Sequence, residues 1–372
     1  MNAKELAELK RQLKKDNPDF FISRIAAAYY SMEDSSPVLK TFSISDFDDL
    51  SDAEQTLYLN ILKKTLTGKL GRNLTEYRFD PGSPIQEKLH TLNQDELKDE
   101  ALAKNFMDFF ARHTTYLNGY ALIVASCQYQ VKDIRKMADE DSGSTHRFLL
   151  VSVNEVTLTD LGLVYDPENN DFEKKQDTDL QVIQRGLDGL MFPSFTDGGS
   201  DVNHIVYSTR TPKKPNEFLI ENLLQVEAVP SYDIEADCFR KILTEVAAED
   251  LDFDTVKHIQ SNLREYVADA QEDGLPAELS KNQLRNILSD SGVAEEKLMR
   301  YNSSYDMNVG EAELRAANIL DPDRLNVKMQ DISVSVKGDA CHKISTRLVD
   351  GKRYLMIEID DGLQVNGVDV SK

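Results

Sequence analysis

The spacing of hydrophobic residues changes character twice along the chain. Up to about residue 229, short apolar runs typical of strands are interspersed with stretches in which apolar residues recur every three or four positions, as in helices. The next stretch has only the helical spacing, and the last alternates apolar with polar positions, which is the period of a strand. The pattern predicts an α+β fold in three parts: an antiparallel-sheet α+β domain at 1–229, a helical section at 230–325 and a small C-terminal β-meander at 326–372.

Strand character marks several apolar segments of the first part. The segments at 120–131 and 147–153 are strongly apolar, and we expect them to pair as antiparallel neighbours. The turn dipeptide Asn118-Gly119 precedes the first of them. The predicted strands of this part lie at residues 20–30, 38–44, 73–79, 120–131, 147–153, 187–195 and 202–209.

The predicted helices of the first part carry local start signals. Ser51 followed by Glu54 is a capping box, in which each residue accepts a backbone hydrogen bond from the other end of the turn. Helical spacing predicts one further helix over 95–113. Pro215 opens a short helix that ends near Leu224, because proline is favoured in the first turn. The charged segments 132–146 and 167–179 are predicted to be loops.

The end of the chain has the clearest hairpin signal. Asp350-Gly351 is a two-residue turn dipeptide, and apolar positions alternate on both sides of it. We therefore predict antiparallel strands that flank this turn. Between 233 and 325 we expect helices and no sheet.

Composition indicates a soluble, cytoplasmic protein. The chain has 372 residues, of which 40% are hydrophobic and 29% charged, so packed cores are expected. No apolar run approaches the roughly 18–20 residues that span a bilayer, and the charged N-terminal helix does not resemble a signal peptide. Cys127, Cys238 and Cys341 are an odd number, far apart, which favours reduced thiols. We expect no membrane association.

The net charge of −22 opposes long-range attraction to nucleic acid, so any such contact has to come from local basic loops. One is STRTPKKPNEF, which contains two lysines between prolines. The other follows the capped helix and has the sequence KKTLTGKLGR. The candidate nucleic-acid contacts are Lys63, Lys64, Lys69, Arg72, Arg210, Lys213 and Lys214. A solvated loop and a glycine-ended helix are the structural alternatives for these two segments.

Catalytic and metal motifs are weak. Asp197, Asp201 and His204 form an acid–histidine cluster in FTDGGSDVNH, and they are polar-site candidates for a metal or a general base. Aspartate and glycine also build turns, and no third or fourth ligand follows from spacing. The string at Gly68–Arg72 lacks the phosphate-loop spacing. We therefore expect no enzyme activity, no cofactor and no metal.

Several phrases in the chain resemble one bacterial family. They are LTGKLGRNLTEYRF, FPSFTDGGSDVNHIVYSTRTPKKPNEFLIENLL and the closing VDGKRYLMIEIDDGLQVNGV. The family carries a domain-of-unknown-function label and is found mostly in Gram-positive anaerobes. The resemblance covers essentially the whole chain and implies no particular activity.

A more distant resemblance concerns the order of the elements. An α+β domain followed by a helical segment and a small β-rich end resembles bacterial nucleoid-associated proteins of the spermidine-nucleoid type. The stretch VNHIVYSTRTPKKPNEFLIENLL is similar to their strand, basic turn and aromatic helix. This resemblance implies nucleic-acid binding, by analogy of architecture.

Three hypotheses follow. The first is a non-enzymatic, nucleoid-associated-like protein that binds nucleic acid weakly through its local basic loops. The alternative is an acidic protein-interaction module, a DNA mimic in effect, whose helical section binds a basic protein partner. An enzyme, either a hydrolase or a metal enzyme, is ranked last.

Overall fold

The computed structural model describes residues 1–131, 144–158, 163–167, 170–174, 180–196, 198–247, 251–272, 277–319, 321, 324–359, 362–365 and 367–370. Internal contacts divide the chain into two units, Met1–Ser231 and Tyr232–Lys372. The predicted α+β fold class is confirmed, because both units combine helices with antiparallel strands. No helix among the described residues has the length and apolar character needed to cross a membrane.

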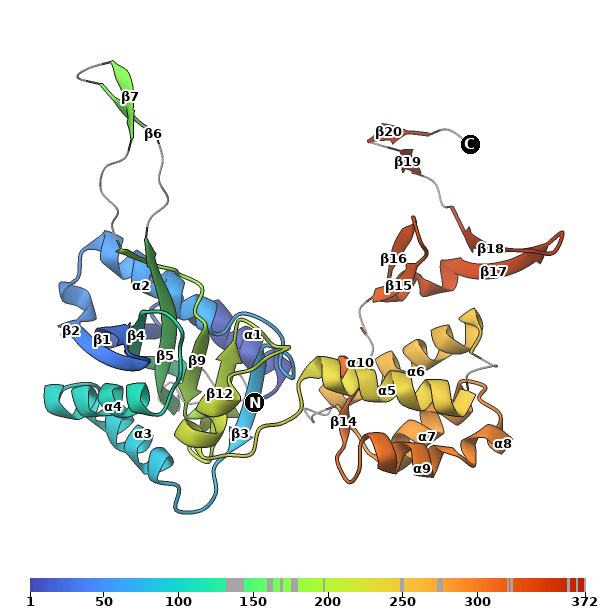
Figure 1. The fold of residues 1–372 in the computed structure, drawn as a ribbon, viewed down its shortest axis with the longest axis horizontal. Coiled ribbons are helices and arrows are strands. Elements are labelled where there is room, and N and C mark those ends of the chain that lie inside the picture. Colours follow the sequence, from blue (N-terminus) through green and yellow to red (C-terminus); the bar gives the residue numbers. More distant parts are fainter. Residues whose placement is uncertain are drawn as a thin grey trace, which may run out of the picture. The chain divides into compact units, whose positions relative to one another are not determined.

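The first unit is built on an eight-stranded sheet with the strand order β2-β1-β4-β5-β9-β12-β3, and β8 pairs with β5 off this path (Figure 1). The predicted pairing of the two most apolar strands is confirmed, since β4 runs antiparallel to β5 from Tyr120↔Glu155 to Val131↔Ser144. The strands of this unit are β1 (Phe20–Glu33), β2 (Ser36–Asp46), β3 (Leu74–Arg78), β4 (Tyr120–Val131), β5 (Ser144–Leu158), β6 (Leu163–Asp166), β7 (Asp171–Lys174), β8 (Leu180–Val182), β9 (Asp188–Phe192), β10 (Ser194–Thr196), β11 (Gly199–Asp201) and β12 (His204–Thr209).

Helices cover both faces of this sheet (Figure 1). Apolar side chains of α1 and α2 form one core with the first face, and those of α3, α4 and η2 form a second core with the other. Strand β4 belongs to both cores: Ile123 and Ala125 lie in the first, and Leu122 and Val124 in the second. The helices are α1 (Ala3–Gln12), η1 (Phe47–Asp49), α2 (Asp52–Thr65), α3 (Pro84–Asp95), α4 (Glu100–Arg112) and the π-helix η2 (Leu219–Leu224).

The helix predicted over 95–113 is wrong in its first turn. A separate helix, α3, occupies Pro84–Asp95, and α4 starts only at Glu100. Between them Glu96 and Leu97 have φ angles of 58° and 59°, a left-handed backbone that no α-helix contains. The chain therefore turns at Glu96 and Leu97, although the helical spacing of apolar residues in the sequence continues through these positions.

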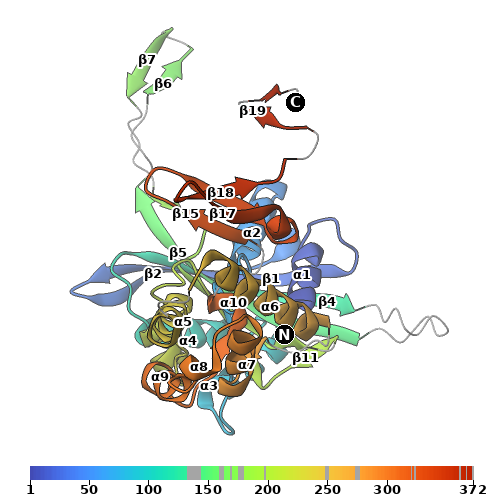
Figure 2. The ribbon, with the colours of Figure 1, turned by 90° about the vertical axis from the view of Figure 1, so that its right-hand side faces the viewer.

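The second unit begins with helices that surround one core (Figure 2). Its buried carboxylate, Glu235, accepts hydrogen bonds from Arg315 Nε at 3.0 Å and Asn318 Nδ2 at 2.6 Å. The helices are α5 (Tyr232–Ala247), α6 (Phe253–Glu272), α7 (Lys281–Asp290), α8 (Glu295–Leu298), α9 (Tyr301–Asn308), α10 (Ala316–Ile319) and the 3₁₀ helix η3 (Gly338–Lys343). The expectation of no sheet before residue 325 is wrong in detail, because a two-residue ladder pairs β13 with β14. Such short pairs leave no alternation to detect.

The C-terminal strands pair as three successive hairpins in the described residues, β15 with β16, β17 with β18 and β19 with β20. The predicted turn between β17 and β18 is confirmed: Asp350 and Gly351 have φ angles of 49° and 75°, as a two-residue hairpin turn requires. The strands of this unit are β13 (Glu278–Leu279), β14 (Leu314–Arg315), β15 (Arg324–Lys328), β16 (Ser333–Lys337), β17 (Ile344–Val349), β18 (Lys352–Ile357), β19 (Gln364–Val365) and β20 (Val368–Asp369).

Candidate nucleic-acid interface

Three strands of the large sheet, β9, β12 and β3, begin or end at the same place, beside Val153 of β5. Asp188, the first residue of β9, pairs with Val153 of β5 and with Thr209, the last residue of β12. Ser208 of β12 pairs in turn with Leu74, the first residue of β3. The loops attached to these strands therefore gather at one end of the sheet, which we call the basic sheet end. It comprises 63–73, 184–187 and 209–214.

The C-terminus of α2 lies directly over this end. A Cβ atom added to Gly189 of β9 would be 2.4 Å from Thr65 Cγ2, so the last turn of the helix is in close contact with the strand. Lys63 and Lys64 stand in that last turn, where cations are favoured by the helix dipole. The Lys64 ammonium donates a hydrogen bond to Gln184 Oε1 at 2.9 Å, which links α2 to the segment before β9.

The loop after α2 is held against the end of β12. Thr209 N donates to Asn73 O at 2.8 Å, and Asn73 Nδ2 donates to Thr209 O at 3.2 Å. A Cβ atom at Gly68 would be 2.4 Å from Asn73 Cβ, and its φ of +119° also requires glycine. Lys69 is exposed and Arg72 is half-buried in this loop. Lys10 of α1 reaches the same loop, because its Nζ donates to Gly68 O at 2.9 Å.

The third basic segment follows β12 directly. The Arg210 amide donates to Leu187 O at 2.9 Å, and its guanidinium forms an ion pair with Glu155 at 3.4 Å. A turn closed by Lys214 N and Thr211 O at 2.9 Å then presents Lys213 and Lys214 on the surface. The three segments are thus joined by hydrogen bonds from residue to residue.

The sequence-predicted basic residues therefore lie at one end of one sheet. The structure brings the loop of Lys69 and Arg72 to Arg210 through Asn73 and Thr209. It also adds two cations that the sequence did not point to, Lys10 and the exposed Arg185. They come from α1 and from the segment before β9, so only the tertiary fold places them here.

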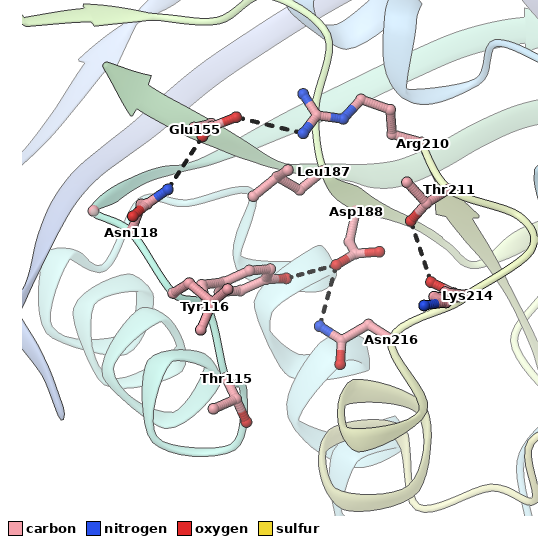
Figure 3. Close-up of a pocket in the computed structure, with 12 residues that line it drawn as sticks. Thr115, Tyr116, Asn118, Glu155, Leu187, Asp188, Arg210, Thr211, Lys214 and Asn216 are labelled. Atoms are coloured by element: carbon pink, nitrogen blue, oxygen red, sulfur yellow. Dashed lines mark hydrogen bonds and ion pairs between the residues drawn. The ribbon is translucent and has the colours of Figure 1, made fainter. Parts of the chain in front are cut away.

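A pocket of about 460 Å³ opens beside the basic sheet end, between it and residues 115–119 (Figure 3). Arg210 and Glu155 form its ion pair, and Asn118 Nδ2 donates to the same glutamate at 3.3 Å. Its lining residues are Thr115, Tyr116, Leu117, Asn118, Gly119, Glu155, Leu187, Asp188, Arg210, Thr211, Lys214 and Asn216.

Asp188 is the buried carboxylate of this pocket, with 6% of its surface exposed. It accepts hydrogen bonds from Tyr207 Oη at 2.7 Å, Tyr116 Oη at 3.0 Å and Asn216 Nδ2 at 3.2 Å (Figure 3 draws the last two). Burial raises the pKa of Asp188, and the donors that surround it lower that pKa in part. With its oxygens engaged by these three donors, Asp188 fixes the pocket wall formed by Tyr116 and Asn216.

No motif in the sequence indicates this carboxylate network. Tyr116, Asp188, Tyr207 and Asn216 lie in different strands and loops, so no spacing joins them. The sign of the network that can be detected in the sequence is Asp188 near the start of the apolar run Leu187–Phe192. A carboxylate in such a run is expected to be buried, and a buried charge requires polar partners.

The polar-site candidates are placed only in part. Asp201 Oδ2 and His204 Nδ1 are 2.7 Å apart, both side chains being partly exposed. Asp197 lies outside the described residues. Among the residues whose placement the structure describes, no group of three or more histidine, cysteine, aspartate or glutamate side chains could hold a metal ion. Asp201, the last residue of β11, and His204, the first of β12, thus form a partly exposed pair, and Asn203 N also donates to Asp201 Oδ1 at 3.0 Å.

The fold and this site describe a two-unit α+β protein with a basic end on its larger sheet. The chain belongs to the family described as a domain of unknown function (DUF4317), whose model matches residues 1–368. This agrees with the family resemblance in the sequence. The comparison with curated proteins returned no match.

Proposed function

We propose that this protein binds nucleic acid without catalysing a reaction, and that the basic sheet end contacts backbone phosphates. The observation that carries the proposal is the chain of hydrogen bonds that joins the three basic segments, from Lys64 to Gln184, from Arg210 to Leu187 and from Thr209 to Asn73. Cations held at fixed positions on a folded end lose less conformational freedom on binding than cations on independent loops.

The side chains of the basic sheet end are of the types that contact phosphate groups. Lys69, Lys213 and Lys214 are exposed, and lysine and arginine supply most protein contacts to phosphate oxygens. The segments 63–73, 184–187 and 209–214 contain eight lysine and arginine residues and no aspartate or glutamate, and Glu155 of β5 pairs with Arg210. The site is therefore locally positive on a chain with a net charge of −22.

The net charge of −22 determines how tightly we expect the protein to bind nucleic acid. Because long-range attraction by the whole molecule is absent, binding rests on contacts within a Debye length of about 8–10 Å. If about three or four phosphates are contacted, the slope of log affinity against log salt is about −3 to −4 on duplex DNA. Binding is weak at physiological salt and stronger at low salt.

Fluorescence anisotropy with a labelled DNA duplex at two salt concentrations tests the proposal. Replacing Lys213 and Lys214 by alanine reduces affinity for all sequences about equally and makes the salt slope less steep by about 2, since each phosphate contact contributes about 0.9. A control variant in which Lys98 and Lys104 of the α4 region become alanine changes the net charge equally and leaves binding intact.

Two results would contradict the proposal. One is the absence of binding at low salt. The other is an equal loss of affinity in the Lys213/Lys214 and Lys98/Lys104 variants, because that would reflect total charge and no defined site.

One observation favours the second candidate function, an acidic module that binds a basic protein. Met299, directly after α8, is 76% exposed and Met307 of α9 is 80% exposed, and their sequence neighbours include Glu295, Glu296 and Asp306. Glu295 pairs with Arg285 and Asp306 with Lys281. Exposed methionines among acids are typical of adaptable protein-binding surfaces. A pull-down from the native host with and without nuclease separates the two: a basic protein retained after nuclease treatment, and lost in Met299→Ser with Met307→Ser, supports this candidate.

A further inference from the structure

Exposed apolar side chains concentrate at the end of the second unit. In the β17–β18 hairpin, Leu348 is 69% exposed, Ile357 52%, Tyr354 48% and Met356 44%. The base of the hairpin is covered, since Ile344 is fully buried and its carbonyl oxygen accepts a hydrogen bond from Lys257 of α6 at 3.0 Å; Thr346 and Leu355, further along the same face, are half-buried. A two-stranded ribbon on its own is marginal in water. The hairpin therefore has the properties of an incomplete sheet (Figures 1 and 2).

Strand β18 has an unpaired outer edge in the described part of the chain, since its ladder is formed with β17 alone. The two-residue turn makes Val349 and Lys352 a hydrogen-bonded pair, so even-numbered residues of β18 direct their backbone groups toward β17. The bond from Glu358 N to Lys343 O at 2.8 Å continues this alternation. Arg353, Leu355 and Ile357 consequently direct their N–H and C=O groups outward, to the edge.

This edge is complementary to itself. If a second copy pairs antiparallel with β18 and Leu355 faces Leu355 of that copy, both leucines present outward backbone groups, as a hydrogen-bonded pair requires. Tyr354 then faces Met356, a favourable sulfur–aromatic pair. Lys352 faces Glu358 at each end, which opposes unlike charges.

Other registers lack this match. A register centred on Tyr354 also allows the outward N–H and C=O groups of the two strands to form hydrogen bonds. In that register, however, Lys352 lies opposite Met356, and Glu358 lies opposite no residue of the partner strand. A shift by one residue would require unlike backbone orientations to pair. Charge complementarity selects the register centred on Leu355.

We propose that β18 is the docking edge for a second copy of this chain, and that two β17–β18 hairpins form a four-stranded sheet with Lys352 of each copy facing Glu358 of the other. The charges near the contact nearly balance, since Arg347, Lys352 and Arg353 accompany Asp350 and Glu358. The net charge of −22 acts at longer range and is screened beyond about 8 Å at physiological salt.

Analytical ultracentrifugation of the full-length protein tests this association, with a monomer mass of 42.1 kDa. A short edge buries less than the roughly 1,600 Å² of a standard interface, so we expect a reversible dimer with a dissociation constant on the order of 10 µM. Lys352→Glu and Glu358→Lys each place like charges opposite one another and weaken the dimer by at least about tenfold.

The decisive measurement is an equimolar mixture of these two variants. In a mixed dimer the two introduced charges face each other at one end and the native Lys352 and Glu358 face each other at the other end, so the mixture associates as tightly as the wild type. A second pair of variants tests the backbone: Leu355→Pro removes an outward N–H and prevents dimerisation, whereas Leu348→Pro removes one from the outer edge of β17 and does not.

Three results would overturn the proposal. A monomer at every accessible concentration excludes the association. A dimer that resists both single charge reversals uses another surface. A mixture that stays monomeric shows that Lys352 and Glu358 do not face each other.

Discussion

Asn73 and Thr209 exchange hydrogen bonds across two loops that are 136 residues apart in sequence, from Thr209 N to Asn73 O at 2.8 Å and from Asn73 Nδ2 to Thr209 O at 3.2 Å. This pair joins the loop of Lys69 and Arg72 to the segment of Arg210. Asn73 is uncharged, so replacing it tests the proposed nucleic-acid site without changing the charge of the protein.

Replacing Asn73 by alanine tests that coupling. The variant loses the side-chain bond to Thr209, which lowers the free energy of unfolding by about 1 kcal/mol. We expect DNA affinity to fall several-fold while the salt slope stays the same, because no cation is removed. Anisotropy titrations at two salt concentrations measure both quantities. Asn222→Ala, on η2, is the control with unchanged affinity; a changed slope in the Asn73 variant would contradict the argument.

Gly189→Ala tests the contact between α2 and β9. The added Cβ would lie 2.4 Å from Thr65 Cγ2 and 2.8 Å from Val151 O, and the backbone oxygen is fixed within the sheet. We expect a loss of about 1–3 kcal/mol in unfolding free energy, measured by urea denaturation. Gly199→Ala is the matched control, since the nearest atom to its Cβ is Thr196 O at 3.8 Å. Equal stability of the two variants would show that α2 moves away without cost.

Local signals in the sequence predicted much of the fold. Ser51 with Glu54 forms the predicted capping box, and Asp350-Gly351 forms the predicted turn. Each of these features depends on residues a few positions apart. The helix break at Glu96 and Leu97 was missed because non-glycine residues in a left-handed backbone carry no composition signal.

The site was predictable only in its charges. The candidate lysines and arginines were named from two basic strings, but their common position depends on the order of β9, β12 and β3 in the sheet. The buried network of Asp188 depends further on Tyr116, which precedes β4. Contacts between residues this far apart follow from tertiary packing, so a single sequence does not reveal them.

Tyr207→Phe tests the network that orders the pocket. The Tyr207 hydroxyl donates to Asp188 Oδ1 at 2.7 Å and accepts from Asn216 N at 2.9 Å. Its loss leaves a buried carboxylate and a backbone amide each short of one partner, and we expect a cost of about 1–3 kcal/mol in urea unfolding. Tyr116→Phe removes one hydrogen bond to Asp188, and we expect it to lower the free energy of unfolding by less. The reverse order would assign the larger role to Tyr116.

His146 gives a prediction for the dependence of stability on pH. Its ring is buried between Phe148 and Phe195, with Nδ1 2.6 Å from Ser200 Oγ, and burial lowers the pKa of His146 from 6.5 to about 3. Between those values the unfolded chain binds a proton at this residue and the folded chain does not. Stability from this residue is therefore present above the unfolded pKa and decreases as pH falls through the window.

His146 is expected to make the free energy of unfolding fall by up to about 1.4 kcal/mol for each pH unit of acidification between pH 6.5 and 3. Urea unfolding at several pH values, with the wild type compared to His146→Gln, isolates it, because all other titrating groups are common to both proteins. The variant should lose stability less steeply as the solution is acidified. Parallel curves for the wild type and His146→Gln would show that His146 takes up its proton without unfolding the chain.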